Sequence, residues 1–246
     1  MEWSARRLNR AARLNGARTY LEIGVFTGGT FRHVDVAVRH GVDPHFRVDR
    51  QFLAGPGVEL FPMTSDRFFS SGTGALYDLV MIDGLHTYEQ AFRDFLCSLS
   101  HAHERTIWLI DDTLPNDVYS TLRDPERTIA ERQKTGSGDP SWHGDVFKIV
   151  PTLHDFFPAF SYATIVNSGN PQTLVWRQPR GGFRPWFNDL ERISRLSYFD
   201  ITPNSMLFNL MDEEAAFARL ARALGEGLAP EAAAAFNQPG KEGVSA

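Results

Sequence analysis

The chain has 246 residues, of which 42% are hydrophobic and 22% are charged, as in ordinary globular proteins with a substantial core. Its net charge of −5 gives no electrostatic reason to expect nucleic acid or an anionic lipid surface as a partner. A single cysteine, Cys97, excludes an internal disulfide. No apolar run approaches the roughly 20 residues that span a bilayer, and the start lacks the apolar core of a secretion signal. We therefore expect a cytoplasmic protein.

The first half of the chain alternates short apolar runs with helical patterns. Residues 1–18 are rich in arginine, which favours a solvated first helix. Residues 19–25 predict a strand, whereas residues 28–40 fit a helix that runs into a second strand, closed by proline at 41–44. Residues 58–66 predict a weaker strand, and Pro62 within it suggests the edge of a sheet.

The strongest predicted strands are residues 77–83 and 106–112. Both runs are short, almost wholly apolar and without alternation, which is typical of strands covered on both faces of a parallel sheet. Between them, apolar residues at helical spacing predict a helix over residues 88–99, with Thr87 and Gln90 as a capping box at its start. Strands alternating with helices indicate an α/β domain.

The second half of the chain is less regular. Residues 113–141 are polar and broken by proline, which predicts a long excursion containing a short helix. A helix is expected over 145–157, followed by an antiparallel pair of strands at 160–168 and 172–178 around a GNP turn. Helices follow, notably at 212–225, and their apolar residues would pack on this domain or on a second subunit of a homo-oligomer. These residues are Leu207, Leu210, Met211, Phe217 and Leu220.

The predicted strands deliver polar residues to one edge of the sheet. In an open parallel sheet, ligands bind beyond the carboxyl ends of the strands. The residues at these ends are Asp43 for the second strand, Ser65 and Asp66 for the third, Asp83 for the fourth, and Asp111 and Asp112 for the fifth. A binding site rich in carboxylates is therefore expected at this edge.

A glycine-rich turn follows the first strand. Glu22, Gly24 and Gly28 frame it, and an acidic residue, Asp43, comes about twenty positions later, a pattern that suits a ligand with a ribose diol. The turn lacks the dinucleotide fingerprint, because Phe26 takes the place of the middle glycine that lets a pyrophosphate approach. The nearby carboxylates would also repel a pyrophosphate. A cationic cofactor without phosphate fits better, and S-adenosylmethionine is one.

Five motifs in order carry a family resemblance: YLEIGVFTGGTF, GVDP, MTSDRFF, DLVMIDGLHTYEQAFRDF and LIDDTLP. Together they resemble the class I S-adenosylmethionine-dependent methyltransferases, most of all the macrocin-type sugar and antibiotic O-methyltransferases. The resemblance implies a Rossmann-like, doubly wound, mostly parallel seven-stranded sheet with an antiparallel closing strand. It implies a methyltransferase domain at 1–180. Beyond that domain, the helical pattern predicts a C-terminal helical extension at 181–230, and the end of the sequence, QPGKEGVSA, predicts a disordered tail at 231–246. The PGG turn of many relatives is missing here, where SHAHERT precedes the fifth strand.

The resemblance also implies roles for individual residues. The glycine turn, with Glu22, Gly24, Phe26 and Gly28, would hold the methionine part of the cofactor. Asp43 would bind the ribose hydroxyls, Ser65 and Asp66 would meet the adenine, and Asp83 would border the cofactor. A divalent metal would be held by Asp83, Asp111 and Asp112, and His86 would serve as the base.

The chemistry of these residues agrees with that assignment. Three clustered carboxylates repel one another and raise at least one pKa unless a cation lies among them. An all-oxygen ligand set suits Mg²⁺ or Mn²⁺, which can chelate two neighbouring hydroxyls of an acceptor while neutral His86 removes a proton. The expected activity is therefore metal-dependent O-methylation of a sugar or polyol-bearing small molecule, with a catechol-type phenol as the alternative acceptor.

Other interpretations stay open. The same pocket could serve a nicotinamide-linked oxidoreductase, or the fold could act as a non-catalytic binding protein. Asp83 could be a turn residue, the Asp111–Asp112 pair a solvated loop start, and His86 a packing residue. Asp66 could be only a helix cap. A further group, Trp142, His143 and Asp145, could form a substrate lid or simply pack.

Overall fold

The computed structural model describes residues 3–72, 74–202 and 204–226, so the predicted tail at 231–246 lies outside the described residues. In this part of the chain, one eight-stranded sheet has the order β3-β2-β1-β4-β5-β7-β6-β8. The strands are β1 (Thr19–Ile23), β2 (Val38–Val42), β3 (Val58–Phe61), β4 (Tyr77–Ile82), β5 (Ala102–Ile110), β6 (Phe160–Ile165), β7 (Gln172–Arg177) and β8 (Leu210–Met211). Strands β1 to β5 pair in parallel, whereas β7 is antiparallel to both of its neighbours.

This topology confirms the predicted Rossmann-like, doubly wound sheet with an antiparallel closing strand. The predicted edge strand, β3, lies at one edge of the sheet. The expected seven strands are extended by the short β8, which pairs in parallel with β6 at the other edge. Because β1 and β4 are neighbours that lead to opposite halves of the sheet, their carboxyl ends open the crevice in which ligands of such sheets bind.

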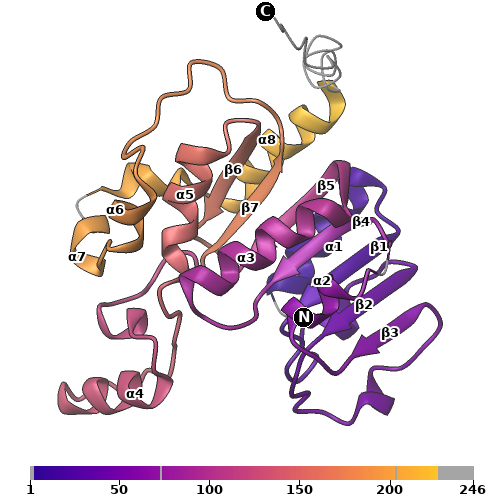
Figure 1. The fold of residues 1–246 in the computed structure, drawn as a ribbon, viewed down its shortest axis with the longest axis horizontal. Coiled ribbons are helices and arrows are strands. Elements are labelled where there is room, and N and C mark those ends of the chain that lie inside the picture. Colours follow the sequence, from indigo (N-terminus) through magenta and orange to yellow (C-terminus); the bar gives the residue numbers. More distant parts are fainter. Residues whose placement is uncertain (1–2, 73, 203, 227–246) are drawn as a thin grey trace, which may run out of the picture.

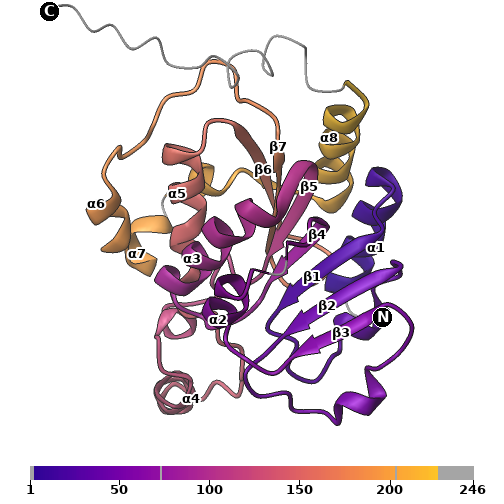
Figure 2. The same ribbon diagram turned by 45° about the vertical axis from the view of Figure 1, so that its right-hand side comes forward.

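Helices cover both faces of the sheet (Figures 1 and 2). One face carries α2 (Ser65–Ser70), α3 (Tyr88–Ser98), α5 (Ile149–Phe156), α6 (Leu190–Ser194) and α7 (Tyr198–Ile201). The other face carries α1 (Trp3–Asn15) and α8 (Glu213–Glu226). The predicted excursion contains α4 (Pro125–Lys134), which Figure 1 places apart from the sheet. No helix in the described ranges is both long and apolar enough to cross a bilayer.

The central strands are buried on both faces, as their unbroken apolar sequences predict. Along β4, Val80 and Ile82 pack towards α3 and α5, while Leu79 and Met81 pack towards α1 and α8. The two halves of the core therefore meet through the sheet. Phe217 and Leu220 of α8 are also buried in this chain, so this helix packs on its own domain.

The predictions for residues 28–40 and for the start of α3 are wrong. Residues 28–40 form no α-helix: a single 3₁₀ turn, η1 (Phe31–His33), precedes β2. The capping box at α3 is also absent, since the Thr87 side chain makes no capping bond. Instead, Asp145 accepts a 2.8 Å hydrogen bond from the amide of Tyr88, because the returning excursion brings a stronger, charged acceptor to the helix start.

Other 3₁₀ turns are η2 (Arg50–Phe52), η3 (Leu99–His101), η4 (Tyr119–Thr121), η5 (Val146–Lys148) and η6 (Ser205–Phe208).

The first helix is not solvated as expected, because α1 lies against the sheet with an arginine inside. Arg7 has 0% of its surface exposed. Its guanidinium donates to Glu213 of α8 at 3.1 Å and to the carbonyl oxygens of Asn167 and Asn170 at 2.7 and 2.6 Å. A further bond reaches the side chain of Gln172 at 2.7 Å. Arg7 thus joins both terminal helices to the loop between β6 and β7.

We expect Arg7→Met to lower the free energy of unfolding by about 3–5 kcal/mol, because it breaks a buried network. Glu213 keeps its ion pair with Arg6 at 2.7 Å, but the carbonyl oxygens of Asn167 and Asn170 lose this donor. Urea denaturation followed by circular dichroism measures the change. The exposed Arg13 of the same helix is the matched control, and Arg13→Met should cost less than about 0.5 kcal/mol. Equal losses in both variants would contradict the role given to Arg7.

Candidate active site

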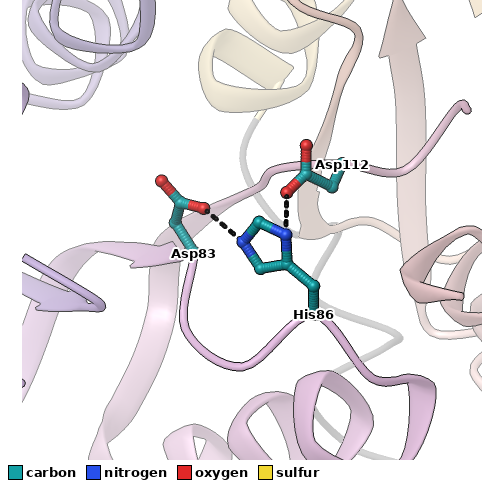
Figure 3. Close-up of side chains that lie close together, drawn as sticks. All are labelled: Asp83, His86 and Asp112. Atoms are coloured by element: carbon teal, nitrogen blue, oxygen red, sulfur yellow. Dashed lines mark ion pairs between the residues drawn. The ribbon is translucent and has the colours of Figure 1, made fainter. Parts of the chain in front are cut away.

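Three predicted site residues meet at the carboxyl ends of β4 and β5. The imidazole of His86 lies between two carboxylates (Figure 3): its Nδ1 is 3.1 Å from Oδ2 of Asp112, and its Nε2 is 3.6 Å from Oδ1 of Asp83. One ligand atom from each of the three residues lies within 4.8 Å of the others. The strand ends thus bring Asp83 and Asp112 together, with a histidine between them.

Backbone geometry selects Asp112 over Asp111 for this position. The amide of Asp111 still pairs with Ile82 of β4 at 3.0 Å, continuing the sheet. Asp112 then turns into the left-handed region with φ of 58°, and its amide donates to the Asp111 carboxylate at 2.8 Å. The Oδ1 atom of Asp111 accepts a 2.6 Å bond from the side chain of Asn170. The structure therefore does not place Asp111 in the group of three.

Asn170 belongs to the loop between β6 and β7 and reaches both aspartates. Its amide nitrogen donates to Asp111 and, at 3.2 Å, to Asp112, while its oxygen faces Nε2 of His143 at 3.4 Å. Because the carbonyl of the same residue is held by Arg7, the first helix fixes this wall of the site. Sequence reasoning missed both residues, since only the GNP turn marked this loop.

The charges at the site are strongly coupled. Burial alone would lower the pKa of His86, but its contact with Asp83 and the charge of Asp112 outweigh burial and raise it to about 9. The pKa of Asp112 is raised by burial and by the charge of Asp111, while His86 opposes that rise. At neutral pH His86 is therefore an imidazolium ion, which neutralises the charge of Asp83 and Asp112. A bound cation would neutralise the same two carboxylates.

The segment that ends the excursion packs over His86. The indole of Trp142 stacks on the imidazole with ring centroids 4.5 Å apart, and its carbonyl oxygen lies 3.0 Å from Nδ1. Gly144 has φ of 58°, and a Cβ atom there would overlap the carbonyl of His86. His143 is buried, with Nε2 3.6 Å from Asp112. These contacts agree with the interpretation that Trp142 and His143 pack structurally. A role of this segment as a substrate lid stays a prediction.

The glycine turn lies next to this group. Gly24 has φ of 90°, and a Cβ atom there would overlap the carbonyl oxygen of Asp83, so only glycine lets β1 and β4 approach this closely. Phe26 is also left-handed, with φ of 51°, and 60% of its surface is exposed. Gly28 has φ of 74° and lies against Leu53. The turn thus presents backbone and an aromatic ring to solvent beside Asp83.

Two buried acidic residues lie near the glycine turn, and one of them, Asp43, is bonded to its backbone. Asp43 is buried, and its two oxygens accept bonds from the amides of Phe26 at 2.7 Å and His45 at 2.6 Å. Each carboxylate oxygen can accept a second bond, so the predicted ribose contact is compatible with this bracing. Glu22 is buried within β1 and accepts a hydrogen bond from the hydroxyl of Tyr20. The predicted cofactor roles of both residues stay predictions.

The residues predicted to meet adenine lie at the start of α2. Thr64 caps that helix, with its hydroxyl accepting from the amide of Arg67 at 3.4 Å, so Asp66 is not the cap. Asp66 pairs with Arg93 at 2.9 Å, and the side chain of Gln90 donates to Asp66 and to Ser65 at 3.1 and 3.2 Å. Gln90 therefore links α3 to α2 instead of completing a capping box.

A buried acid beside these residues was missed. Asp94 is 1% exposed on the inner face of α3, three residues after Ala91, and accepts a 3.0 Å bond from Gln90. Burial raises its pKa to about 6. The only sequence signal was its helical spacing from Ala91, which placed an acid on the apolar side.

Comparison with known proteins agrees with this fold. Residues 3–113 match a protein family described as a methyltransferase domain. A Staphylococcus aureus structure described as a caffeoyl-CoA O-methyltransferase is 14% identical, covers 72% of this chain and 84% of its own, and has a TM-score of 0.54. A Klebsiella pneumoniae structure described as an O-methyltransferase is 18% identical, covers 71% and 79%, and has a TM-score of 0.50. No curated protein sequence matches the chain.

Residues 3–113 therefore match a methyltransferase domain, and the sheet has the topology of the Rossmann-like methyltransferase fold. The matched residues include β1 to β5 and end just after Asp111 and Asp112. The match favours a methyltransferase over the nicotinamide-linked oxidoreductase that the glycine turn left open.

We expect Asp94→Asn to become more stable than the natural protein as pH rises from about 4 to 6. The unfolded chain ionises Asp94 near its ordinary pKa of 3.8, whereas the folded protein keeps it protonated to about pH 6. The natural protein therefore loses about 3 kcal/mol across this interval and no more above it. Urea unfolding at several pH values tests this, and a difference independent of pH would contradict it.

Proposed function

We propose that the protein transfers the methyl group of S-adenosylmethionine to one of two neighbouring hydroxyls of a small molecule. The supporting observation is the convergence of Asp83, His86 and Asp112 from two adjacent strand ends, beside the glycine turn. Hydroxyl methylation needs a base to take the proton of the hydroxyl, and negative charge near the sulfonium ion of the cofactor. A histidine between two carboxylates, next to the glycine turn, can provide both.

A catechol-type phenol is the acceptor class we favour, with a sugar or polyol second. The sequence motifs placed the sugar first. The likeness in fold to a protein described as a caffeoyl-CoA O-methyltransferase supports the phenol. So does the indole of Trp142, stacked on the proposed base, because it offers an aromatic face to a planar acceptor.

The residues of the site fit a divalent metal ion. Two carboxylates and an imidazole lie within mutual ligand distance, and His86 bears the positive charge that their cluster requires. Asp83 and Asp112 would hold such an ion, with Asp111 and Asn170 beside them as the outer support. When bound, it would polarise the two acceptor oxygens and lower the pKa of one hydroxyl.

His86 is the proposed base, acting at Nε2. Its Nδ1 faces a carboxylate oxygen of Asp112 and the carbonyl oxygen of Trp142, so this nitrogen carries a hydrogen. Neutral His86 takes the acceptor proton at Nε2, and Asp112 stabilises the imidazolium that forms. The acceptor oxygen then bonds to the methyl carbon as the carbon–sulfur bond breaks, which leaves S-adenosylhomocysteine.

Metal binding and protonation of His86 should compete. Since the pKa of His86 is about 9, its neutral fraction rises steeply between pH 6.5 and 8.5, and we expect Mn²⁺ affinity to rise by roughly 75-fold over that interval. Calorimetry without cofactor or acceptor measures this directly. In His86→Gln the affinity should change far less with pH, and Asp112→Asn should bind weakly throughout. An affinity that does not depend on pH would remove the metal assignment.

Turnover should depend on His86 while cofactor binding does not. With a simple catechol as acceptor, His86→Gln should lower kcat by about 10²–10⁴. Calorimetry should give an unchanged affinity for S-adenosylhomocysteine, because the polar contacts of the imidazole are with Asp83, Asp112 and Trp142 and not with the glycine turn. A vicinal sugar diol in a parallel assay decides between the two acceptor classes, with mass spectrometry to detect the added methyl group. Unaltered turnover in the variant would refute the role as base.

A further inference from the structure

A hollow lies near the amino ends of the parallel strands, on the side of the sheet opposite to the candidate active site. Its volume is about 630 Å³, and it is bounded by the segment after β7, by the end of α5 and by α8. Strand β7 runs antiparallel to β5, with Thr173 beside Ile110, so Gln178 at its far end lies about 17 Å along the strand from the active-site edge. Figure 1 shows this segment arching over α5 between β7 and α6.

Four arginines line this hollow: Arg180, Arg184, Arg219 and Arg222. Within the described residues, none of the four makes an ion pair with a carboxylate. By contrast, the buried Arg7 and Arg132 each have a carboxylate partner. Burial lowers the pKa of Arg219; Tyr162 opposes this effect and repulsion from Arg222 adds to it.

One carboxylate whose charge acts on Arg180, that of Asp155, is bonded to the backbone. Asp155 accepts bonds of 2.8 Å from the amides of Trp186, Phe187 and Asn188. It thereby fastens the segment that forms one wall of the hollow, and three donors already offset its charge. The positive charge of the hollow thus remains open to a ligand.

The walls are rigid and partly aromatic. Arg180 is anchored by the carbonyl oxygens of Phe160 at 2.8 Å and His154 at 2.6 Å. The imidazole of His154 stacks on the indole of Trp186, with centroids 3.4 Å apart and planes 3° from parallel. Nδ1 of His154 accepts from Arg180 while Nε2 faces the carbonyl of Arg184, so this imidazole is neutral and its ring is fixed. A preorganised site loses little conformational entropy on binding.

We propose that this hollow binds a small molecule through its phosphate groups, at a site separate from methyl transfer. Guanidinium groups match phosphate oxygens with paired hydrogen bonds, and several uncompensated ones in a concave site favour a multivalent anion. A small ligand fits better than nucleic acid, because the positive charge lies inside a hollow on a protein of net charge −5.

Calorimetry on the full chain in about 50 mM salt tests this with inorganic phosphate, pyrophosphate, adenosine diphosphate and adenosine. S-adenosylhomocysteine is kept in excess, so that the cofactor pocket is filled. Pyrophosphate and adenosine diphosphate should bind, inorganic phosphate should bind more weakly, and adenosine should not bind. Binding of adenosine equal to that of its diphosphate, or no binding of any phosphate probe, would overturn the proposal.

Variants locate the site. Arg219→Gln and the more exposed Arg222→Gln should each weaken pyrophosphate binding about tenfold or more, since each removes a charged hydrogen-bond donor. Arg13→Gln, an exposed arginine on α1, is the matched control and should have no effect. Hydrogen exchange should show protection of residues 178–186 by pyrophosphate. Equal losses in the control, or protection elsewhere only, would place the anion outside this hollow.

Discussion

The candidate site depends on one electrostatic constraint: two carboxylates at neighbouring strand ends need a positive charge between them. In the protein alone, His86 fulfils that need as an imidazolium ion between Asp83 and Asp112. A metal ion would fulfil it differently and would leave the imidazole neutral. The same residue therefore serves as internal counter-ion and as proposed base, because its proton and the metal compete for the same negative charge.

Much of the fold and part of the site could be predicted from local patterns. Unbroken apolar runs predicted strands such as β4 and β5, since side chains covered on both faces leave no polar period. Strand ends placed Asp83 and Asp112 at one edge, because a parallel sheet aligns its carboxyl ends. The choice between Asp111 and Asp112 could not be made, as it depends on a left-handed residue that spacing does not reveal.

The missed features depend on segments far apart in the sequence. Arg7 reads as a surface cation, yet its partners lie in the loop before β7 and in α8. Thr87 and Gln90 satisfy a capping pattern, but Asp145 from a distant loop provides the bond. Local propensity cannot include such partners, so the parts of the site that the excursion and the β6–β7 loop contribute became visible only in three dimensions.

The bond between Arg7 and Glu213 has a consequence for how the protein is assembled. The two residues lie 206 positions apart in the sequence, so α1 cannot pair its buried cation with Glu213 during synthesis until α8 has been made. Arg7 in turn holds the carbonyl oxygen of Asn170, and hence the wall beside Asp111 depends on α1 being fixed in place. A growing chain would thus hold most strands of the sheet before this wall of the candidate site was complete.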